Sequence, residues 1–466
     1  MKDIDLIKTV PSERQLNYMQ TEFYAFIHFT VNTYTDKEWG DGTEPESIFN
    51  PTEFSAEQWV SAVRSAGMKG LILTCKHHDG FCLWPSKYTE HSVKNCPVKR
   101  DFVGEVAAEC QKQGIKFGVY LSPWDRNNAT YGSGKDYDDY FVAQLTELLT
   151  QYGEIFSVWF DGACGEGPNG KKQVYDWERY YSVIRELQPG ACIVVCGPDI
   201  RWCGNEAGHT RKSEWSVVPA RMRNTERTAK KSQKKDDKKF RRKHIRARDK
   251  DLGSRRLMNR EADAIWYPAE VNTSIRPGWF FHEFENELVR PLEKLIQIYY
   301  NSVGGNATFL LNLPPDRRGL IHETDVARLK ELGDYLKKTF GKNYCENAEI
   351  TCDSDDGKNL CENIKTDSYD TYFKTPDGVT AAEVTVKLPE KAEVSHVVLK
   401  ENVNLSQRIE KFKIYADVNG RRKRVFASTV VGYKRIAHFA PVKTDKITIK
   451  ITDSRVSPTL SFVGIY

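Results

Sequence analysis

The sequence has no long hydrophobic run. None of its 466 residues falls in a stretch of about 18 apolar residues, and a helix that spans a bilayer needs about 20. The first eleven residues, Met1 to Pro11, are charged and lack the apolar core of a signal peptide. We therefore expect no membrane span. The protein is expected either in the cytosol or outside the cytoplasm (periplasmic or secreted) after removal of a leader.

Cysteine pairs with the spacing of zinc ligands are also missing. The 11 cysteines are scattered among strand and helix patterns, and no Cys-x-x-Cys pair occurs. Their odd number argues against a complete framework of disulfides. Cysteine usage therefore does not decide the compartment.

Positive charge is concentrated in one segment. The whole chain has a net charge of +5, yet residues 221–256 carry 17 Lys and Arg against 5 Asp and Glu, so the remainder is acidic. Between Thr225 and Lys250 there is almost no aliphatic periodicity, and we interpret this tract as a mobile surface loop inserted between barrel elements. Phe240 is its only aromatic ring, which gives little support for base stacking, so we predict no nucleic-acid partner.

Aromatic residues, in contrast, are abundant. The chain has 22 Tyr, 22 Phe and 10 Trp, more than a core alone needs, and sugar-binding clefts use such rings to cover the apolar face of a pyranose.

A chain of 466 residues exceeds the usual size of a single domain, so two domains are expected.

Short apolar runs alternate with amphipathic segments over the first three quarters of the chain. Strands are predicted at 23–29, 70–74, 116–121, 156–160, 192–195 and 308–311, with helices between most of them. This alternation predicts a parallel sheet with right-handed crossovers. Polar and aromatic residues collect after the strands, which is typical of a (β/α)8-like TIM barrel with its site at the carboxyl face. We assign residues 1–341 to this barrel, with the basic insertion at about 221–256.

The pattern changes after Gly341. Residues 342–466 contain short alternating runs, such as 383–388, 412–415 and 446–451, that read as antiparallel strands. A second, all-β sandwich domain is predicted there.

Asp161 is the first candidate for chemistry. It follows the buried-strand pattern of 155–160 and precedes Gly162, so it is expected at the rim of the sheet, where parallel α/β proteins bind their ligands. We hypothesise that it is a catalytic nucleophile acting on a sugar. The alternative is an Asp that closes an Asp-Gly turn.

Glu270 is the second candidate, because it also follows an aromatic-rich run. A retaining glycosidase holds two carboxyl groups about 5 to 5.5 Å apart and an inverting one about 6.5 to 9.5 Å apart. Rings of Trp266, Tyr267 and Trp279 could raise the pKa of Glu270 and keep it protonated as the acid. The alternative is an ion pair with Arg276.

His28, His77 and His78 lie at or just past strand ends. Three histidines suggest zinc, but neighbours in an extended chain point to opposite faces, so His77 and His78 do not easily bind one ion. We favour neutral hydrogen-bond partners for sugar hydroxyls, with buried structural histidines as the alternative, and predict no metal. For the tryptophans Trp39, Trp84, Trp124 and Trp279, stacking on sugar and packing in the core are equal alternatives.

Six motifs together resemble glycoside hydrolase family 29, the α-L-fucosidases. They occur in the family's order from about residue 20 to 340: Phe26–Phe29 (FIHF), Glu38–Gly40 (EWG), Thr74–Phe81 (TCKHHDGF), Phe117–Tyr120 (FGVY), Trp159–Gly162 (WFDG) and Asn306–Asn312 (NATFLLN). The resemblance implies an exo-acting, retaining enzyme that needs no cofactor and releases terminal L-fucose from fucosylated oligosaccharides or glycoconjugates. The other class considered is a non-catalytic fucose-binding or glycan-binding protein on the same barrel.

The resemblance also implies roles for individual residues. Asp161 would form a covalent fucosyl-enzyme. The fucose pocket would be lined by His28, Glu38, Trp39, His77, His78, Tyr120 and Trp159. The stretch 266–279 is similar to the subfamily that prefers α-1,3/1,4-linked fucosides; there Glu270 takes the place of the acid/base. We add Trp124, Arg276 and Trp279 as substrate-binding residues.

The C-terminal domain resembles the galactose-binding-like sandwiches that accompany such barrels. It could bind glycan, but we favour a bracing role. The sequence leaves the oligomeric state open.

Overall fold

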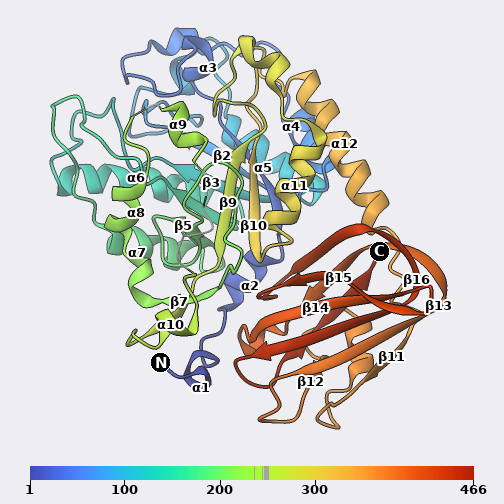
Figure 1. The fold of residues 1–466 in the computed structure, drawn as a ribbon. Coiled ribbons are helices and arrows are strands. Elements are labelled where there is room, and N and C mark those ends of the chain that lie inside the picture. The colour runs from blue at the N-terminus through green and yellow to red at the C-terminus, as the bar shows by residue number, and fades with distance from the viewer. Residues whose placement is uncertain (236, 244, 246–250) are drawn as a thin grey trace.

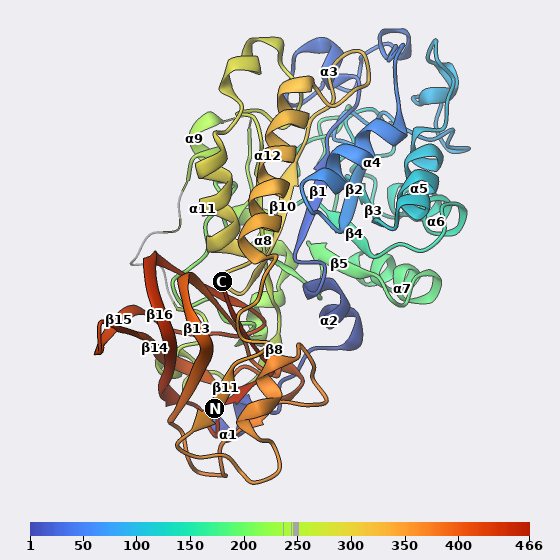
Figure 2. The same cartoon turned by 90° about the vertical axis from the view of Figure 1, so that its right-hand side faces the viewer.

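The computed structural model describes residues 1–235, 237–243, 245 and 251–466. A mixed α/β body and a β-rich C-terminal region are visible in Figures 1 and 2. Part of the predicted basic loop, residues 236, 244 and 246–250, lies outside the described residues.

Eight parallel strands form the central sheet, in the order β5-β4-β3-β2-β1-β10-β9-β6. Val194 of β5 also bridges Ile200, which directly precedes β6, so the two edge strands meet and the barrel is nearly closed. The predicted (β/α)8-like barrel is therefore confirmed. Its strands are β1 Phe23–Ile27, β2 Gly70–Lys76, β3 Lys116–Leu121, β4 Ser157–Phe160, β5 Cys192–Val195, β6 Arg201–Trp202, β9 Ala269–Ser274 and β10 Ala307–Asn312.

Burial explains why the strands read as continuous apolar runs. Every residue of β1, β2, β4 and β5 is buried, because helices cover the outer face of the sheet and side chains fill its interior. The helices are α1 Asp3–Leu6, α2 Glu13–Met19, α3 Asn32–Thr35, α4 Ala56–Ser65, α5 Phe102–Gln113, α6 Lys135–Gln151, α7 Trp177–Leu187, α8 Thr225–Lys231, α9 Lys238–Arg241, α10 Arg255–Met258, α11 Leu292–Ser302 and α12 Glu323–Phe340.

Local sequence signals set several helix ends. The Ser55 side chain accepts the backbone N–H of Gln58 and begins α4, as predicted, and Asp101 caps α5 in the same way through Gly104. Gly114 ends α5 with a left-handed backbone, φ 69°, which glycine adopts without a steric penalty.

From its composition we expected the basic segment, at about residues 221–256, to be a mobile loop; it contains short helices, and its mobility stays a prediction. Its described residues form the short helices α8 and α9, and α9 lies at the same upper end of the barrel as α3 (Figure 1). These helices bury few aliphatic side chains, so no apolar periodicity marks them in the sequence.

The region around Glu270 also differs from the prediction. Ala264–Trp266 forms β8, which pairs antiparallel with β7, Val217–Pro219, outside the barrel sheet. The barrel strand β9 begins only at Ala269, so Glu270 is its second residue and does not follow a strand end.

The C-terminal region is all-β, as predicted. Its six-stranded sheet has the order β11-β13-β16-β14-β15, with β18 on β13, and its pairs are antiparallel. This sheet and the β12–β17 ribbon enclose a separate hydrophobic core. The strands are β11 Glu349–Cys352, β12 Phe373–Lys374, β13 Ala382–Lys400, β14 Ile409–Val418, β15 Arg421–Ser428, β16 Arg435–Ser454, β17 Thr459–Leu460 and β18 Phe462–Ile465. The domain limits 1–341 and 342–466 stay a prediction.

The C-terminal sheet lies below the barrel, at the end opposite α3 (Figures 1 and 2). Glu22, directly before β1, accepts hydrogen bonds from the Tyr433 hydroxyl at 2.9 Å and from Lys434 Nζ at 2.8 Å. Asn306, directly before β10, accepts the backbone N–H of Tyr433 at 2.8 Å. These contacts at the amino ends of the strands leave the carboxyl-end mouth to other elements.

Membrane crossing requires a helix with both length and high hydropathy. No helix in the described part of the chain combines the two.

Candidate functional site

A pocket opens at the carboxyl ends of the barrel strands. Its empty volume, including its mouth, is about 590 Å³. It is lined by Phe26, His28, Glu38, Trp39, His77, His78, Trp159, Asp161, Gly162, Ala163, Val195, Trp202, Glu206, Ser232, Gln233, Asn272 and Trp279. Aromatic rings and a few polar groups at one end of the barrel form the kind of lining that small-molecule sites have.

Asp161 directly follows β4 and lies in this lining. Its Oδ2 accepts a hydrogen bond from the Tyr120 hydroxyl at 3.0 Å, and its Oδ1 accepts the backbone N–H of Ala163 at 2.8 Å. Burial raises the pKa of Asp161, while these donors and the charge of Lys234 oppose that rise. The carboxylate is thus fixed in orientation and turned toward the pocket.

Three histidines stand beside it without charge. Burial lowers the pKa values of His28 and His78 to about 3 and that of His77 well below its usual range. His28 Nδ1 lies 2.8 Å from Asn312 Oδ1, and His78 Nδ1 lies 2.7 Å from Ser122 Oγ. These contacts orient the imidazoles of His28 and His78 as neutral hydrogen-bonding groups, and the expected bonds to sugar hydroxyls stay a prediction.

Glu38 joins two loops at the mouth. Its carboxylate accepts the backbone N–H of Trp279 at 2.9 Å and lies 2.8 Å from His282 Nε2. Although burial opposes the charge, Glu38 and Asp36 raise the pKa of His282 to about 9. The resulting ion pair holds the Trp279 loop against the loop that carries Glu38.

Glu206 is a third carboxyl group in the pocket, beside Asp161 and Glu38. It lies in the loop after β6 and accepts a hydrogen bond from Trp279 Nε1 at 3.2 Å. Burial, together with the negative charges of Asp161 and Glu38, raises its pKa to about 8, against the opposing effects of Trp279 and Arg241. Glu206 is therefore protonated at neutral pH.

Glu270 is placed elsewhere. It lies fully buried inside the barrel and does not line the pocket. Its Oε2 accepts the hydroxyls of Tyr18 at 2.7 Å and Tyr24 at 2.6 Å, and its Oε1 accepts Trp159 Nε1 at 2.8 Å. Since side chains two residues apart on a strand point the same way, Asn272 reaches the pocket and Glu270 lies deeper beneath it. The predicted pairing of Glu270 with Asp161 is wrong, because its carboxyl group has no access to a substrate.

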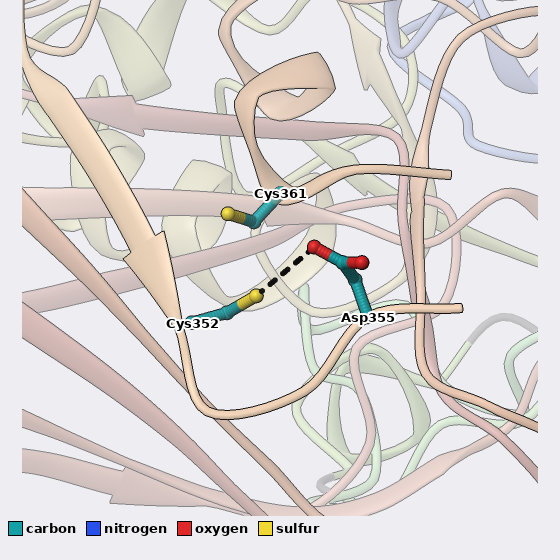
Figure 3. Close-up of side chains that lie close together, drawn as sticks. All are labelled: Cys352, Asp355 and Cys361. Carbon is teal, nitrogen blue, oxygen red and sulfur yellow. Dashed lines mark hydrogen bonds between the residues drawn. The ribbon is translucent and has the colours of Figure 1, made fainter. Parts of the chain in front are cut away.

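Possible metal donors gather away from the pocket. Among the described residues, one group of at least three His, Cys, Asp or Glu brings its donor atoms within 4.8 Å of one another: Cys352, Asp355 and Cys361 of the C-terminal region (Figure 3).

The family model described as Alpha-L-fucosidase matches residues 7–341. This chain belongs to the α-L-fucosidases, glycoside hydrolase family 29. It is a glycoside hydrolase, as the motifs predicted.

Relatives of the α-L-fucosidase family match almost the whole chain. Alpha-L-fucosidase 1 of Arabidopsis thaliana is 36% identical over 99% of this chain and 88% of its own length. A putative α-L-fucosidase structure from Bacteroides ovatus is 43% identical, with a TM-score of 0.84, over 98% of this chain and 74% of that chain. A family 29 fucosidase from Ruminococcus gnavus, solved in complex with fucose, is 28% identical, with a TM-score of 0.84, over 98% of this chain and 95% of that chain.

Most residues that the fucosidase motifs predicted for the pocket do line it. These are His28, Glu38, Trp39, His77, His78, Trp159, Asp161 and Trp279. Their substrate contacts stay predictions.

Three predicted substrate-binding residues do not line the fucosidase pocket. Tyr120 is fully buried and contacts Asp161 from below. Trp124 packs behind the lining, edge-on to Trp39 with 5.4 Å between ring centroids. Arg276 is fully buried, and its Nε donates to Asp325 Oδ2 at 2.8 Å, so its charge serves an internal ion pair and not Glu270.

Glu206 is the functional candidate that sequence reasoning missed. The strand before it, β6, has only two residues, so no apolar run marks a strand end there. Gly204 and Gly208 flank Glu206 with φ values of 102° and 83°, and this pair of turn glycines was the available signal for an exposed loop. The pocket residues Trp202 and Asn272 were missed for the same reason, since β6 and β9 were not recognised.

Proposed function

We propose that the protein is a retaining, exo-acting α-L-fucosidase in which Asp161 is the nucleophile and Glu206 the acid/base. The observation that carries this proposal is that both carboxyl groups line one pocket, where Tyr120 and Ala163 hold the carboxyl group of Asp161 and the indole of Trp279 holds that of Glu206. A double displacement at a sugar requires two such carboxyl groups at one site, one as nucleophile and one as acid/base.

In the first step Asp161 attacks C1 of fucose. Glu206 donates its proton to the glycosidic oxygen, the bond from C1 to that oxygen breaks, and the leaving sugar departs with a new hydroxyl group. Tyr120 and the backbone N–H of Ala163 hold the carboxylate of Asp161 in its orientation.

In the second step Glu206, now ionised, removes a proton from water. The water oxygen attacks C1, the bond to Asp161 breaks, and fucose leaves with the configuration it had in the substrate. The neutral histidines His28, His77 and His78 supply hydrogen bonds to fucose hydroxyls without adding charge.

The form of the pocket supports exo action on a terminal sugar. Phe26 and Trp159 belong to its lining and are buried, and the barrel interior beneath them is filled by Glu270 and its partners. A relative solved with fucose supports fucose as the occupant. Preference for α-1,3/1,4 linkages is part of the proposal and is supported by the similarity of the stretch 266–279 to that subfamily.

Two azide experiments separate the roles of the two acids. For Glu206→Ala with an aryl α-fucoside, azide attacks the fucosyl-enzyme, and we expect faster turnover and α-fucosyl azide. For Asp161→Gly, azide occupies the place of the nucleophile, and we expect β-fucosyl azide. Nuclear magnetic resonance identifies the anomer. The assignment of the two roles would be overturned if the two variants gave each other's anomer or no fucosyl azide.

Digestion of α-1,2-, α-1,3-, α-1,4- and α-1,6-linked fucosides tests the linkage preference.

A further inference from the structure

A groove lined by basic side chains opens beside Glu206. Its empty volume is about 720 Å³, and it shares Glu206 and Trp279 with the pocket. We use the name cationic groove for the part formed by Lys238, Arg241, Arg242 and Arg290.

The basic segment forms part of the mouth. The Phe240 ring of α9 stacks on Trp202 with 6.2 Å between centroids, and Arg241 Nη1 lies 3.5 Å from Glu38 Oε2. Earlier in the same segment, Ser232 lies against Gly162. A Cβ atom on Gly162 would come within 2.1 Å of Ser232 Oγ. The segment therefore closes one side of the pocket beside Asp161.

Arg241 of the groove pairs with Glu38, but the other three basic side chains have no acidic partner among the described residues. Lys238 and Arg242 are exposed, and neither forms an ion pair with any residue that the structure describes. Arg290 donates to the backbone oxygen of Ser274 and to Thr273 Oγ1, which are neutral. Within the described lining, Glu206 is the only acid, and its raised pKa leaves it uncharged at neutral pH.

The position of the groove indicates what part of a substrate it receives. In the proposed function, on which this inference rests, Glu206 protonates the oxygen between fucose and the leaving sugar. The leaving glycan therefore begins next to Glu206. Because Glu206 lines both the pocket and the cationic groove, the glycan can continue from the pocket into the groove. Arginine forks and lysine bind carboxylate and sulfate by charge-assisted hydrogen bonds.

We propose that the cationic groove binds an anionic group, a carboxylate or a sulfate ester, on the glycan that leaves. The basic segment thus selects acidic fucosylated glycans over neutral ones. Neutral fucosides remain substrates, because the reacting groups do not depend on that contact.

The test uses three glycans that share one fucose linkage: a neutral glycan, a sialylated glycan that carries a carboxylate, and a sulfated glycan. We expect kcat/KM for at least one acidic glycan to exceed that of the neutral glycan by roughly tenfold at low salt, the range of charge-assisted hydrogen bonds. Added sodium chloride is expected to reduce this ratio, because exposed charges are screened. Which acidic glycan is favoured identifies the anion.

A double variant and a matched control locate the effect. Lys238→Gln with Arg242→Gln should bring the ratio close to one. Arg223→Gln with Lys230→Gln removes the same charge from the same segment outside the groove, and should keep the wild-type ratio. A wild-type ratio near one, or a ratio that the groove variant does not change, overturns the proposal. Failure to hydrolyse any aryl fucoside would instead overturn the proposed function.

A second, independent site lies in the C-terminal region. Cys352 ends β11, Cys361 begins the short 3₁₀ helix Cys361–Lys365, and Asp355 lies on the loop between them (Figure 3). Cys352 Sγ donates to Asp355 Oδ2 at 3.5 Å, and the three donor atoms lie within 4.8 Å of one another.

We infer that these three side chains bind a thiophilic divalent cation of the zinc type. Two sulfur ligands and one carboxylate match the donor preference of zinc, and water completes a tetrahedron. Cation binding displaces the thiol protons into solvent. The ion would link the end of β11 to the 3₁₀ helix that packs on the core of the sandwich.

Cobalt(II) titration of the full chain tests this site. Thiolate ligands give an intense sulfur-to-cobalt charge-transfer band, which we expect at one cobalt per chain and which zinc should displace. The double variant Cys352→Ser with Cys361→Ser should lose the band while the other nine cysteines remain. A band of equal intensity in that variant, no band in the wild type, or a Cys352–Cys361 disulfide found by mass spectrometry in the purified protein overturns the inference.

Discussion

Glu206 and Glu270 each accept a hydrogen bond from an indole N–H. The donor to Glu206 is Trp279, at 3.2 Å. The donor to Glu270 is Trp159, at 2.8 Å. Burial raises the pKa of both carboxyl groups, so neither the type of partner nor the direction of the shift distinguishes them.

Their remaining surroundings differ. Glu206 lines the pocket together with Asp161, whose negative charge adds to the rise of its pKa. Glu270 is fully buried and accepts two further hydrogen bonds, from Tyr18 and Tyr24. A raised pKa therefore marks a candidate acid only where the group also reaches a place for substrate. Where all contacts are internal, the same shift accompanies a structural carboxyl group.

The largest loss of activity is expected for Asp161→Asn. This change removes the nucleophile but keeps the shape of the side chain, so kcat should fall by roughly 10⁴-fold or more while the fold is retained. Hydrolysis of an aryl fucoside measures the first effect, and circular dichroism with thermal unfolding measures the second. Activity within tenfold of the wild type would remove Asp161 from the mechanism.

Glu206→Gln is expected to have the next largest effect. Loss of a positioned general acid typically costs about 10² to 10⁴ in rate, and the loss should be greater for a glycan than for an aryl fucoside whose leaving group needs no proton. Comparing kcat/KM for both substrates measures this difference. If both substrates lose activity equally, Glu206 does not supply the proton.

The pH dependence of kcat/KM provides a smaller effect in the unmodified protein. Because Glu206 acts in its protonated form and its pKa is about 8, activity should fall about tenfold per pH unit above that value. The residual activity of Glu206→Gln should lack this alkaline limb. A limb that persists in the variant belongs to another group.

Glu270→Gln should change stability more than chemistry. The single oxygen of the amide can accept both tyrosine hydroxyls, but its NH2 group then faces the donor Trp159 Nε1, and an unsatisfied buried hydrogen-bonding group costs about 1 to 3 kcal/mol. We expect a lower free energy of unfolding, measured by urea denaturation, and folded protein with kcat within about tenfold of the wild type. Azide should not accelerate Glu270→Ala, and acceleration would restore Glu270 as the acid.

The sequence sufficed where one element carries both the fold and the site. The run ending at Phe160 is a barrel strand, and Asp161 follows it, so strand periodicity located the rim and the carboxylate together. Prediction from the sequence failed where the pairing partner of a strand decides which sheet it joins. The apolar and aromatic run Ile265–Tyr267 resembles a barrel strand, but β8 pairs with β7 outside the barrel.

Two further features depend on contacts between distant residues. β6 is held by its pairing with β9, and its two residues carry no pattern of their own. The helix α9 is ordered by stacking of Phe240 on Trp202 and by the contact of Arg241 with Glu38, which composition alone does not reveal. Local propensity is a weak guide to such elements, because tertiary packing overrides it.

The smallest effect on activity is expected for a third glutamate, Glu22, at the seam between the barrel and the C-terminal sheet. Burial favours its neutral form, but Lys434, Lys400 and Lys69 lower its pKa from 4.5 to about 2. Three cations therefore reverse the effect that burial has on Glu206 and Glu270. Because the folded-state pKa is the lower one, the stabilisation is fully present above pH 4.5 and is lost as the pH falls from 4.5 toward 2.

Glu22→Gln should lower the free energy of unfolding by about 3 kcal/mol at neutral pH, with kcat unchanged. Urea denaturation of the wild type and of Glu22→Gln between about pH 7 and about pH 3 measures the difference in their free energies of unfolding. This difference should shrink on acidification. The variant Glu383→Gln, which removes ion pairs with Arg422 and Lys450 on the surface of the C-terminal sheet, is the control and should cost less than about 1 kcal/mol. A difference for Glu22→Gln that does not change with pH would mean that the lysines do not hold this carboxyl group in its charged form, and that burial governs all three glutamates alike.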